Sequence, residues 1–211
     1  MSIEQHKYEN HKRGYVELDA GWLKNGWLGG VRRCFSPNFD ARPADETVDL
    51  LVVHNISLPP GLFGTQSVEA FFSNCLDATC HDYFKEIAEL RVSSHFYVRR
   101  NGELSQFVST EQRAWHAGVS EYAGRVKCND FSIGVEMEGC DDVPYTFAQY
   151  RVLAQLSVRI MEQYPAITVS RITGHENIAP GRKTDPGPAF DWTFFREMLA
   201  DFQDVQKVQD T

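Results

Sequence analysis

Residue types that bind metal ions or carry charge gather in one short stretch of the chain, Gly174 to Pro188, which contains His175, Lys183 and Asp185. Three prolines and three glycines interrupt this stretch, so neither a continuous helix nor a central strand can form there. We therefore expect a loop of fixed shape, the kind of segment on which proteins usually place chemistry. The hypothesis that follows is a metal site in which His175 and Asp185 are ligands.

A second histidine, His54, ends a short apolar run that starts at Asp49, and such a run is typical of a strand buried on both faces. His175 follows another expected strand, Thr168 to Thr173. Because ligands in α/β proteins collect beyond strand ends, the two imidazoles could meet there. A structural role is the alternative for either histidine alone. Together with Asp185 they favour one zinc ion, since two histidines and a carboxylate leave a tetrahedral position open for water.

Two further roles would complete a hydrolytic site. Lys183 and Asp185 are two residues apart in extended chain, so both can point to one side, and the lysine could stabilise an oxyanion beside the metal. A solvated lysine is the alternative. Glu136 and Glu138 share one face of the alternating strand from Phe131 to Glu138, and either carboxylate could be the general base. Alternation does not distinguish them, and one could instead support a histidine.

The composition excludes several classes of protein. A net charge of −8 and a pI near 5.4 argue against a nucleic-acid-binding protein, which would carry a basic surface. No stretch is long and apolar enough for a membrane span, and the first residues lack the apolar core of a signal peptide. The five cysteines form an odd number without a CxxC pair, which predicts free thiols in a reducing compartment. We therefore expect a cytoplasmic protein.

Strand and helix patterns interleave along the chain, which predicts one α/β domain, residues 1–211, with a central mixed β-sheet flanked by helices. Residues 1–20 are polar and are expected to form a weakly ordered lead-in, followed by an irregular surface segment over residues 20–44. Thr65 should cap a helix whose apolar stripe includes Cys75, so that this thiol packs in the core. Asn101-Gly102 predicts a type I′ hairpin turn. Further helices are expected over residues 83–90, 146–164 and 191–202, and a capping box from Thr146 to Gln149 should open the second of them.

Four separated motifs carry a resemblance that covers about residues 15–200: His54-Asn55, Ala114 to Gly118, Cys128 to Gly139, and Gly174 to Gly187. Together they resemble the zinc-dependent N-acetylmuramoyl-L-alanine amidases, and within them the cytosolic type that acts on 1,6-anhydro-N-acetylmuramyl peptides. The resemblance implies the fold shared by these amidases and the peptidoglycan-recognition proteins. It also implies hydrolysis of the amide bond between the lactyl group of N-acetylmuramic acid and L-alanine, in the recycling of cell-wall turnover products.

The same resemblance implies roles for individual residues. The three expected metal ligands would bind one zinc ion, Glu136 rather than Glu138 would be the general base, and Lys183 would stabilise the oxyanion. The partner would be a small muropeptide, bound by a monomer, with no nucleic acid or membrane involved. Six other residues are weaker candidates for holding the sugar or peptide carboxylates, and each could instead serve packing or solvation: Asn55, Arg113, Trp115, His116, Arg125 and Lys127.

Two other functions are compatible with the same fold. A periplasmic amidase acting on intact peptidoglycan would keep the same site but would need an export signal. A non-catalytic peptidoglycan-binding module would be expected to lack a zinc ligand, whereas all three ligand residues are present here.

Overall fold

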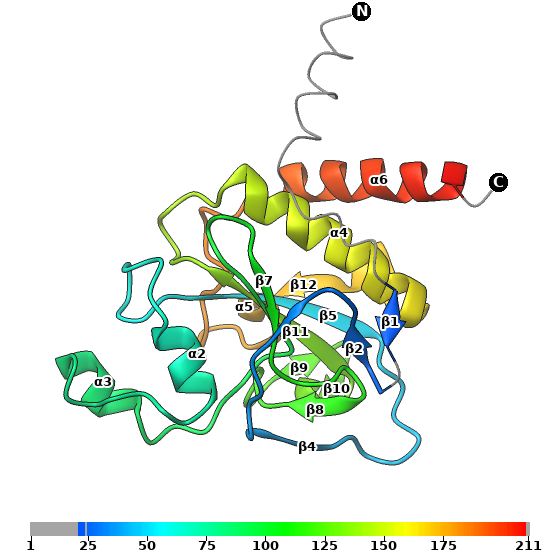
Figure 1. Ribbon diagram of the computed structural model, residues 1–211. Helices are drawn as coiled ribbons and strands as arrows, with labels where there is room; N and C mark the ends of the chain where they lie inside the picture. Colours follow the sequence, from blue (N-terminus) through cyan, green and yellow to red (C-terminus); the bar gives the residue numbers. More distant parts are fainter. Residues whose placement is uncertain (1–20, 24, 210–211) are drawn as a thin grey trace, which may run out of the picture.

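A six-stranded mixed sheet forms the centre of the computed structural model, which describes residues 21–23 and 25–209 (Figure 1). From one edge to the other, the strands are β12 (Ile172–Gly174), β5 (Leu50–Ile56), β11 (Ser132–Glu138), β6 (Phe96–Val98), β7 (Leu104–Gln106) and β3 (Arg32–Arg33). The first four are parallel to one another, β7 is antiparallel to β6, and β3 is parallel to β7. The predicted mixed α/β sheet is confirmed.

The alternation along β11 gives the sheet two chemically different faces. The odd-numbered residues from Ile133 to Met137 are buried in an apolar cluster with Leu51 and Val53 of β5 and with residues of α4 and α6. The even-numbered residues of β11 point to the opposite face, where Leu50 and Val52 belong to a separate, smaller cluster. The polar side chains of the predicted site therefore share one face of the sheet, and the main apolar core occupies the other.

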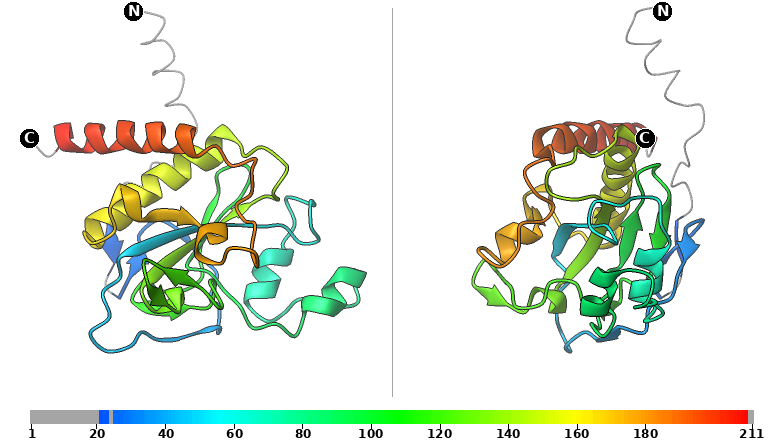
Figure 2. Two further views of the ribbon diagram at one scale, coloured as in Figure 1. Left: turned by 180° about the vertical axis from the view of Figure 1, so that it is seen from behind. Right: turned by 90° about the vertical axis from the view of Figure 1, so that its left-hand side faces the viewer.

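Two long helices cover the apolar face of the sheet: α4 (Phe147–Gln163) and α6 (Trp192–Gln209) (Figures 1 and 2). The predicted capping box at the start of α4 is confirmed, since Thr146 accepts a hydrogen bond from the Gln149 backbone and Gln149 bonds back to the Thr146 backbone. Asp191 accepts from the Phe194 backbone N at 2.9 Å and so caps α6. This last helix continues beyond the residue 202 expected from the sequence.

The helix predicted to start at Thr65 is shorter than its apolar stripe suggested. It is α2 (Ser67–Phe72), and the chain leaves it through Asn74, whose φ is 60°. Cys75 therefore falls outside the helix and is exposed, so the prediction that it packs in the core is wrong. The next helix, α3 (Asp82–Ile87), lies within the expected range. All five cysteines are free, as their number and spacing predict.

Two other local predictions, a turn and a strand, needed correction. The turn at Asn101-Gly102 is not type I′, because only Gly102 has a positive φ (86°), and its N donates to Arg99 O at 2.9 Å. The first part of the expected strand over residues 168–173 is the 3₁₀ turn η2 (Val169–Arg171), which precedes β12. Residues 1–20 lie outside the described part of the chain.

The segment expected to be irregular over residues 20–44 contains four short strands, of which β3 joins the main sheet. The other three strands of this segment lie in small antiparallel pairs: β1 (Trp22–Leu23) pairs with β2 (Trp27–Leu28), and β4 (Phe39–Ala41) pairs with β8 (Gln112–Ala114). A further antiparallel pair is formed later in the chain by β9 (Glu121–Tyr122) and β10 (Arg125–Val126). Across residues 21–23 and 25–209, no helix combines the length and the apolar character that a membrane crossing requires.

Candidate metal centre and active site

Three elements that are distant in sequence bring the predicted metal ligands together. His54 belongs to β5, and His175 is the first residue of the one-turn helix α5 (His175–Ile178), directly after the neighbouring strand β12. Asp185 lies in the loop beyond α5, and its carbonyl accepts a hydrogen bond from Glu176 N at 2.9 Å. This bond folds the Pro/Gly-rich loop back onto the helix. The predicted loop of fixed shape therefore starts with a single helical turn.

The ligand atoms of these three residues form a compact, buried triangle. His54 Nδ1 and His175 Nδ1 are 2.9 Å apart, and Asp185 Oδ2 is 3.1 Å from each of them. The histidines are only 1% and 3% exposed. Ligand atoms around a tetrahedral zinc ion lie about 3.3 Å apart, so the triangle is close to the size that such an ion requires. Two imidazoles and a carboxylate are also a donor set that zinc favours, and the residues present therefore fit a metal ion.

The charge states of the group agree with a metal site. Burial, together with the neighbouring His175, lowers the pKa of His54 to about 4, although Asp185 acts in the opposite direction. Burial opposes the ionisation of Asp185, but its contacts with His175 and His54 outweigh burial and hold its pKa below the usual range. A neutral imidazole and an ionised carboxylate are the forms that bind metal ions.

The two glutamates that alternation left undistinguished have different surroundings. Both oxygens of Glu138 accept backbone hydrogen bonds, Oε1 from Gly64 N at 2.5 Å and Oε2 from Arg100 N at 2.8 Å. Glu136 is also buried, yet its Oε2 has no hydrogen-bond partner. Burial, with the Asp185 carboxylate nearby, raises the pKa of Glu136 well above its usual value, and Lys183 opposes this shift. Glu138 therefore holds two loops in place, whereas Glu136 has an oxygen available for a reactant.

Lys183 is exposed on the same loop as Asp185, and its backbone N donates to Ala179 O at 3.0 Å. Its ammonium charge lies close enough to the site to lower the pKa of both Glu136 and His54. The lysine is thus an electrostatic neighbour of the predicted base and of a predicted ligand. That arrangement is compatible with stabilising negative charge on a bound reactant.

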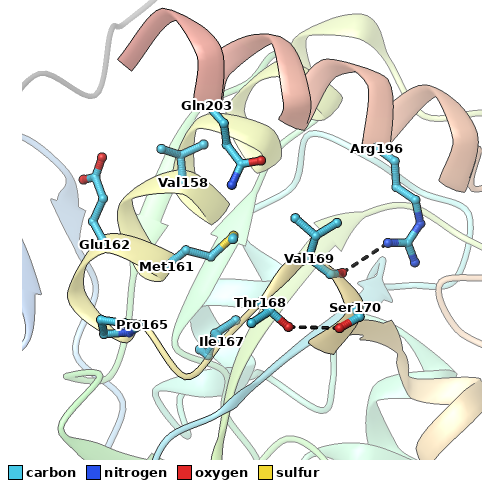
Figure 3. Close-up of a pocket in the computed structure, with 10 residues that line it drawn as sticks. All are labelled: Val158, Met161, Glu162, Pro165, Ile167, Thr168, Val169, Ser170, Arg196 and Gln203. Atoms are coloured by element: carbon cyan, nitrogen blue, oxygen red, sulfur yellow. Dashed lines mark hydrogen bonds between the residues drawn. The ribbon is translucent and has the colours of Figure 1, made fainter. Parts of the chain in front are cut away.

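A wide groove elsewhere on the molecule does not contain this chemistry. It has a volume of about 830 Å³ and lies between α4, η2 and α6 (Figure 3). Apolar side chains such as Val158 and Met161 line it, with Glu162 and Arg196 among the charged residues. None of the site residues predicted from the sequence lines this groove. The candidate metal centre therefore lies apart from this groove.

Comparison with known proteins identifies the family. The family model described as N-acetylmuramoyl-L-alanine amidase matches residues 44–188, which include all three members of the metal group. The chain belongs to the N-acetylmuramoyl-L-alanine amidase family. Among its relatives, the 1,6-anhydro-N-acetylmuramyl-L-alanine amidase AmpD of Escherichia coli is 56% identical over 178 residues, which cover 84% of this chain and 97% of the relative.

Solved structures of related amidases share the fold. The crystal structure of a selenomethionine derivative of AmpD superimposes with a TM-score of 0.81 at 55% sequence identity, covering 84% of this chain and 99% of the other. The amidase AmiD of E. coli, in complex with the substrate anhydro-N-acetylmuramic acid-L-Ala-D-γ-Glu-L-Lys, matches with a TM-score of 0.52 at 27% identity, covering 74% of this chain and 60% of the other. The amidase fold that the sequence motifs imply is confirmed.

Two of the residues predicted to hold substrate in this amidase are already paired with acidic side chains. Arg113 contacts Asp40 and Asp130. Arg125 contacts Glu46 and Asp49, and its guanidinium also lies over the ring of Phe131, 3.8 Å from the ring centroid. Each guanidinium therefore links separate segments of the chain, which favours the structural alternative for both residues.

The other four predicted substrate residues differ in exposure. Lys127 is exposed and Trp115 is half-buried, so both retain surface for a ligand. Asn55 donates to Asp141 Oδ1 at 2.9 Å and to Pro186 O at 3.0 Å, so it attaches the loop that carries Asp185 to the end of β5. His116 is buried beside His54, and its Nδ1 lies 2.9 Å from His54 Nε2. His116 thus contacts a predicted metal ligand and is not exposed at the surface where a substrate would bind.

The structure also shows a contact that the sequence analysis did not predict, made by the exposed residue Arg182. Arg182 donates to Ala117 O at 2.7 Å and to Val119 O at 2.6 Å, which connects the loop that carries Asp185 to the segment after β8. Spacing offers no signal for this contact, because the two segments are 65 residues apart in sequence. In the sequence, the only indication that these segments lie close together is that both belong to the family resemblance, as the motifs Ala114 to Gly118 and Gly174 to Gly187.

Proposed function

We propose that this protein is a zinc-dependent 1,6-anhydro-N-acetylmuramyl-L-alanine amidase that acts in peptidoglycan recycling. The observation that carries the proposal is the buried triangle of His54, His175 and Asp185 beside Glu136, whose Oε2 has no partner. Membership of the amidase family and 56% identity to an AmpD relative over 84% of the chain support the substrate class.

In this proposal His54, His175 and Asp185 hold one zinc ion. A bound zinc ion supplies Lewis acidity, which lowers the pKa of water and polarises a carbonyl group. Glu136 takes a proton from the attacking water and returns it to the nitrogen of the departing L-alanine. Lys183 stabilises the negative charge that develops on the lactyl carbonyl oxygen during the attack. The amide bond breaks, and the products are the free peptide and the sugar with a lactyl carboxylate.

The proposed substrate is an anhydro-muramyl peptide, with or without an attached N-acetylglucosamine. The related amidase AmiD, solved with an anhydro-N-acetylmuramic acid tripeptide, supports this chemistry. We propose that Trp115 and Lys127, which retain exposed surface, contact the sugar or the peptide carboxylates. For Asn55, Arg113 and Arg125, the contacts within the protein favour support of the surrounding loops.

We further propose that the whole chain, residues 1–211, is one domain that works as a monomer in the cytoplasm. The five free cysteines are compatible with a reducing compartment. All the described strands and helices are arranged around one six-stranded sheet. Light scattering after gel filtration tests the oligomeric state, and cell fractionation of the producing bacterium tests the location.

Mass spectrometry of anhydro-muramyl tripeptide incubated with the protein tests the reaction. Zinc-loaded protein should release free tripeptide and anhydro-muramic acid, whose masses sum to that of the substrate plus one water. Chelated protein should release neither. Intact peptidoglycan serves as the competing substrate, because faster release from the intact wall would point instead to a periplasmic, wall-degrading amidase. No hydrolysis of either substrate would point to a non-catalytic binding module.

A further inference from the structure

Both metal-binding imidazoles are held at their second ring nitrogen by one short segment, His116-Ala117. His54 Nε2 lies 2.9 Å from the Nδ1 of His116. His175 Nε2 lies 3.0 Å from the carbonyl oxygen of Ala117. Two adjacent residues therefore contact the Nε2 atoms of both histidines, whereas Asp185 faces their Nδ1 atoms.

The proton positions along these contacts follow from the fixed partners. Ser132 has one hydroxyl proton, which it donates to Cys128 O at 2.5 Å, so its oxygen can only accept from His116 Nε2 at 3.2 Å. With its proton on Nε2, neutral His116 presents Nδ1 as an acceptor, and the proton between the two rings belongs to His54 Nε2. A carbonyl oxygen only accepts, so His175 donates from Nε2 to Ala117 O. Arg182 Nη2 lies 3.3 Å from the same ring nitrogen, but its two protons go to Ala117 O at 2.7 Å and Val119 O at 2.6 Å.

We propose that the His116-Ala117 segment is a positioning element that fixes the tautomers of both zinc-binding histidines. With both protons on Nε2, the two Nδ1 atoms are unprotonated and point at Asp185 Oδ2, 3.1 Å from each. Three acceptor atoms facing one another need a cation between them. His116 acts through His54 and is a positioning residue, not a group that touches substrate. This inference rests on the zinc site of the proposed function.

The position of this segment is itself fixed from two sides. Asn129 Oδ1 accepts from the backbone N of His116 at 3.1 Å and from that of Ala117 at 2.7 Å. On the sheet, Gly134 of β11 leaves the space that the imidazole of His116 occupies. A Cβ at Gly134 would lie 2.6 Å from His116 Cγ and 2.7 Å from its Nδ1, closer than real side-chain contacts come. Both contacts orient the ring toward His54.

The test compares His116→Leu with His116→Asn, two side chains that branch in the same way at Cγ. Asn places an oxygen on Cγ, where the imidazole carries Nδ1, and so keeps an acceptor for His54, whereas Leu removes it. The matched control is His95→Leu, because His95 is also buried and the centroid of its ring lies 5.7 Å from that of His116. Its ring nitrogens contact Gly134 N, Gln112 O and Arg42 Nη2 rather than a metal ligand.

Zinc affinity is measured by competition with a chromogenic chelator, and the visible spectrum of cobalt-substituted protein reports the ligand geometry. We expect His116→Leu to weaken zinc binding roughly ten- to hundredfold and to change the cobalt spectrum. His116→Asn should recover most of the affinity, and His95→Leu should retain it even if it lowers thermal stability. Equal losses in His116→Leu and His116→Asn, or an unchanged affinity in His116→Leu, would overturn the inference.

A measurement on the unsubstituted protein keeps the inference testable if a variant does not fold. Long-range ¹H–¹⁵N NMR of the zinc-loaded protein identifies the protonated nitrogen of each histidine. The inference requires protons on Nε2 of His54, His116 and His175, and a proton on His116 Nδ1 would contradict it. Failure of the unsubstituted protein to bind zinc at all would instead contradict the proposed function, so the two failures are distinguishable.

Discussion

Glu136 lies directly beside His54 across the parallel pair β11–β5, where the two residues are register partners. Register partners on neighbouring strands point to the same face of a sheet. The predicted base and the predicted zinc ligand are therefore attached to two adjacent strands inside the sheet, at a separation set by backbone hydrogen bonds. Only the loop bearing Lys183 and Asp185 has to be folded onto this pair.

Glu136→Gln should affect turnover, whereas Glu138→Gln should affect the stability of the fold. Glu136→Gln removes the proposed base and should lower kcat by about 10²–10⁴, with zinc affinity and stability nearly unchanged. Glu138→Gln places an NH₂ group against one of two backbone N–H donors, Gly64 or Arg100, and should cost about 1–3 kcal/mol of stability. Steady-state kinetics and urea unfolding measure both effects. Turnover near wild type in Glu136→Gln would exclude it as the base.

Lys183→Met should lower kcat by about 10²–10³, because it removes a charge that stabilises the developing oxyanion. The zinc affinity should change much less, since Lys183 is not a ligand. Lys85→Met is the matched control: Lys85 is also exposed but pairs with Asp82 on α3. If both variants lost activity equally, the loss could not be assigned to the active-site loop.

Removal of zinc should abolish hydrolysis and lower the melting temperature. Metal binding to the folded protein alone stabilises it by about 2.7 kcal/mol at a free metal concentration of 100 times the Kd. Calorimetry with and without chelator measures the shift, and Asp185→Asn should reduce it. A melting temperature independent of zinc in the unsubstituted protein would argue against a metal ion between His54 and His175.

His95 should make the metal-free protein less stable in acid. Burial, with the Arg42 guanidinium nearby, lowers the pKa of His95 from 6.5 to about 3. The unfolded chain binds a proton that the folded chain does not, so the stability from neutral His95 is full above pH 6.5 and is lost as the pH falls toward 3. The slope is at most about 1.4 kcal/mol per pH unit.

Urea unfolding of chelated protein at several pH values measures this slope for the unsubstituted chain and for His95→Asn. Asn keeps an acceptor for Gly134 N, which donates to His95 Nδ1 at 3.0 Å, but it does not titrate. In His95→Asn, the slope of unfolding free energy against pH should correspond to about one fewer proton bound on unfolding, while the contributions of His54 and His116 remain. Identical slopes in the two proteins would show that His95 is not the group responsible.

Gly134→Ala should destabilise the protein although its backbone conformation suits any residue. The added methyl would lie 2.6–2.9 Å from the His116 ring, and such overpacking typically costs about 1–3 kcal/mol. Gly21→Ala is the control, because no atom lies within 4 Å of a Cβ built there. Thermal unfolding measures both variants. If Gly134→Ala were as stable as the control, the His116 ring would have room to move.

The sequence alone predicted the class of fold and three candidate metal ligands, which the structure brings together. Histidine and aspartate types, the Pro/Gly loop and the strand ends are local features, and each is visible in a single stretch of residues. The run through His54 and the alternation of β11 correctly predicted two central strands, and the Thr146 capping box correctly predicted the start of α4. Such features depend on neighbours a few residues away, so spacing is enough to detect them.

The tertiary structure decided which polar residues are free to react. Glu136 and Glu138 are equivalent by alternation, and they differ only because Gly64 N and Arg100 N, distant in sequence, reach Glu138. His116, predicted to hold substrate, instead contacts His54 across 62 positions of sequence. Cys75 lies outside the core because the helix ends at Phe72 and the chain turns at Asn74, which has a positive φ. Hydrogen-bond partners and burial are set by long-range packing, which no local pattern encodes.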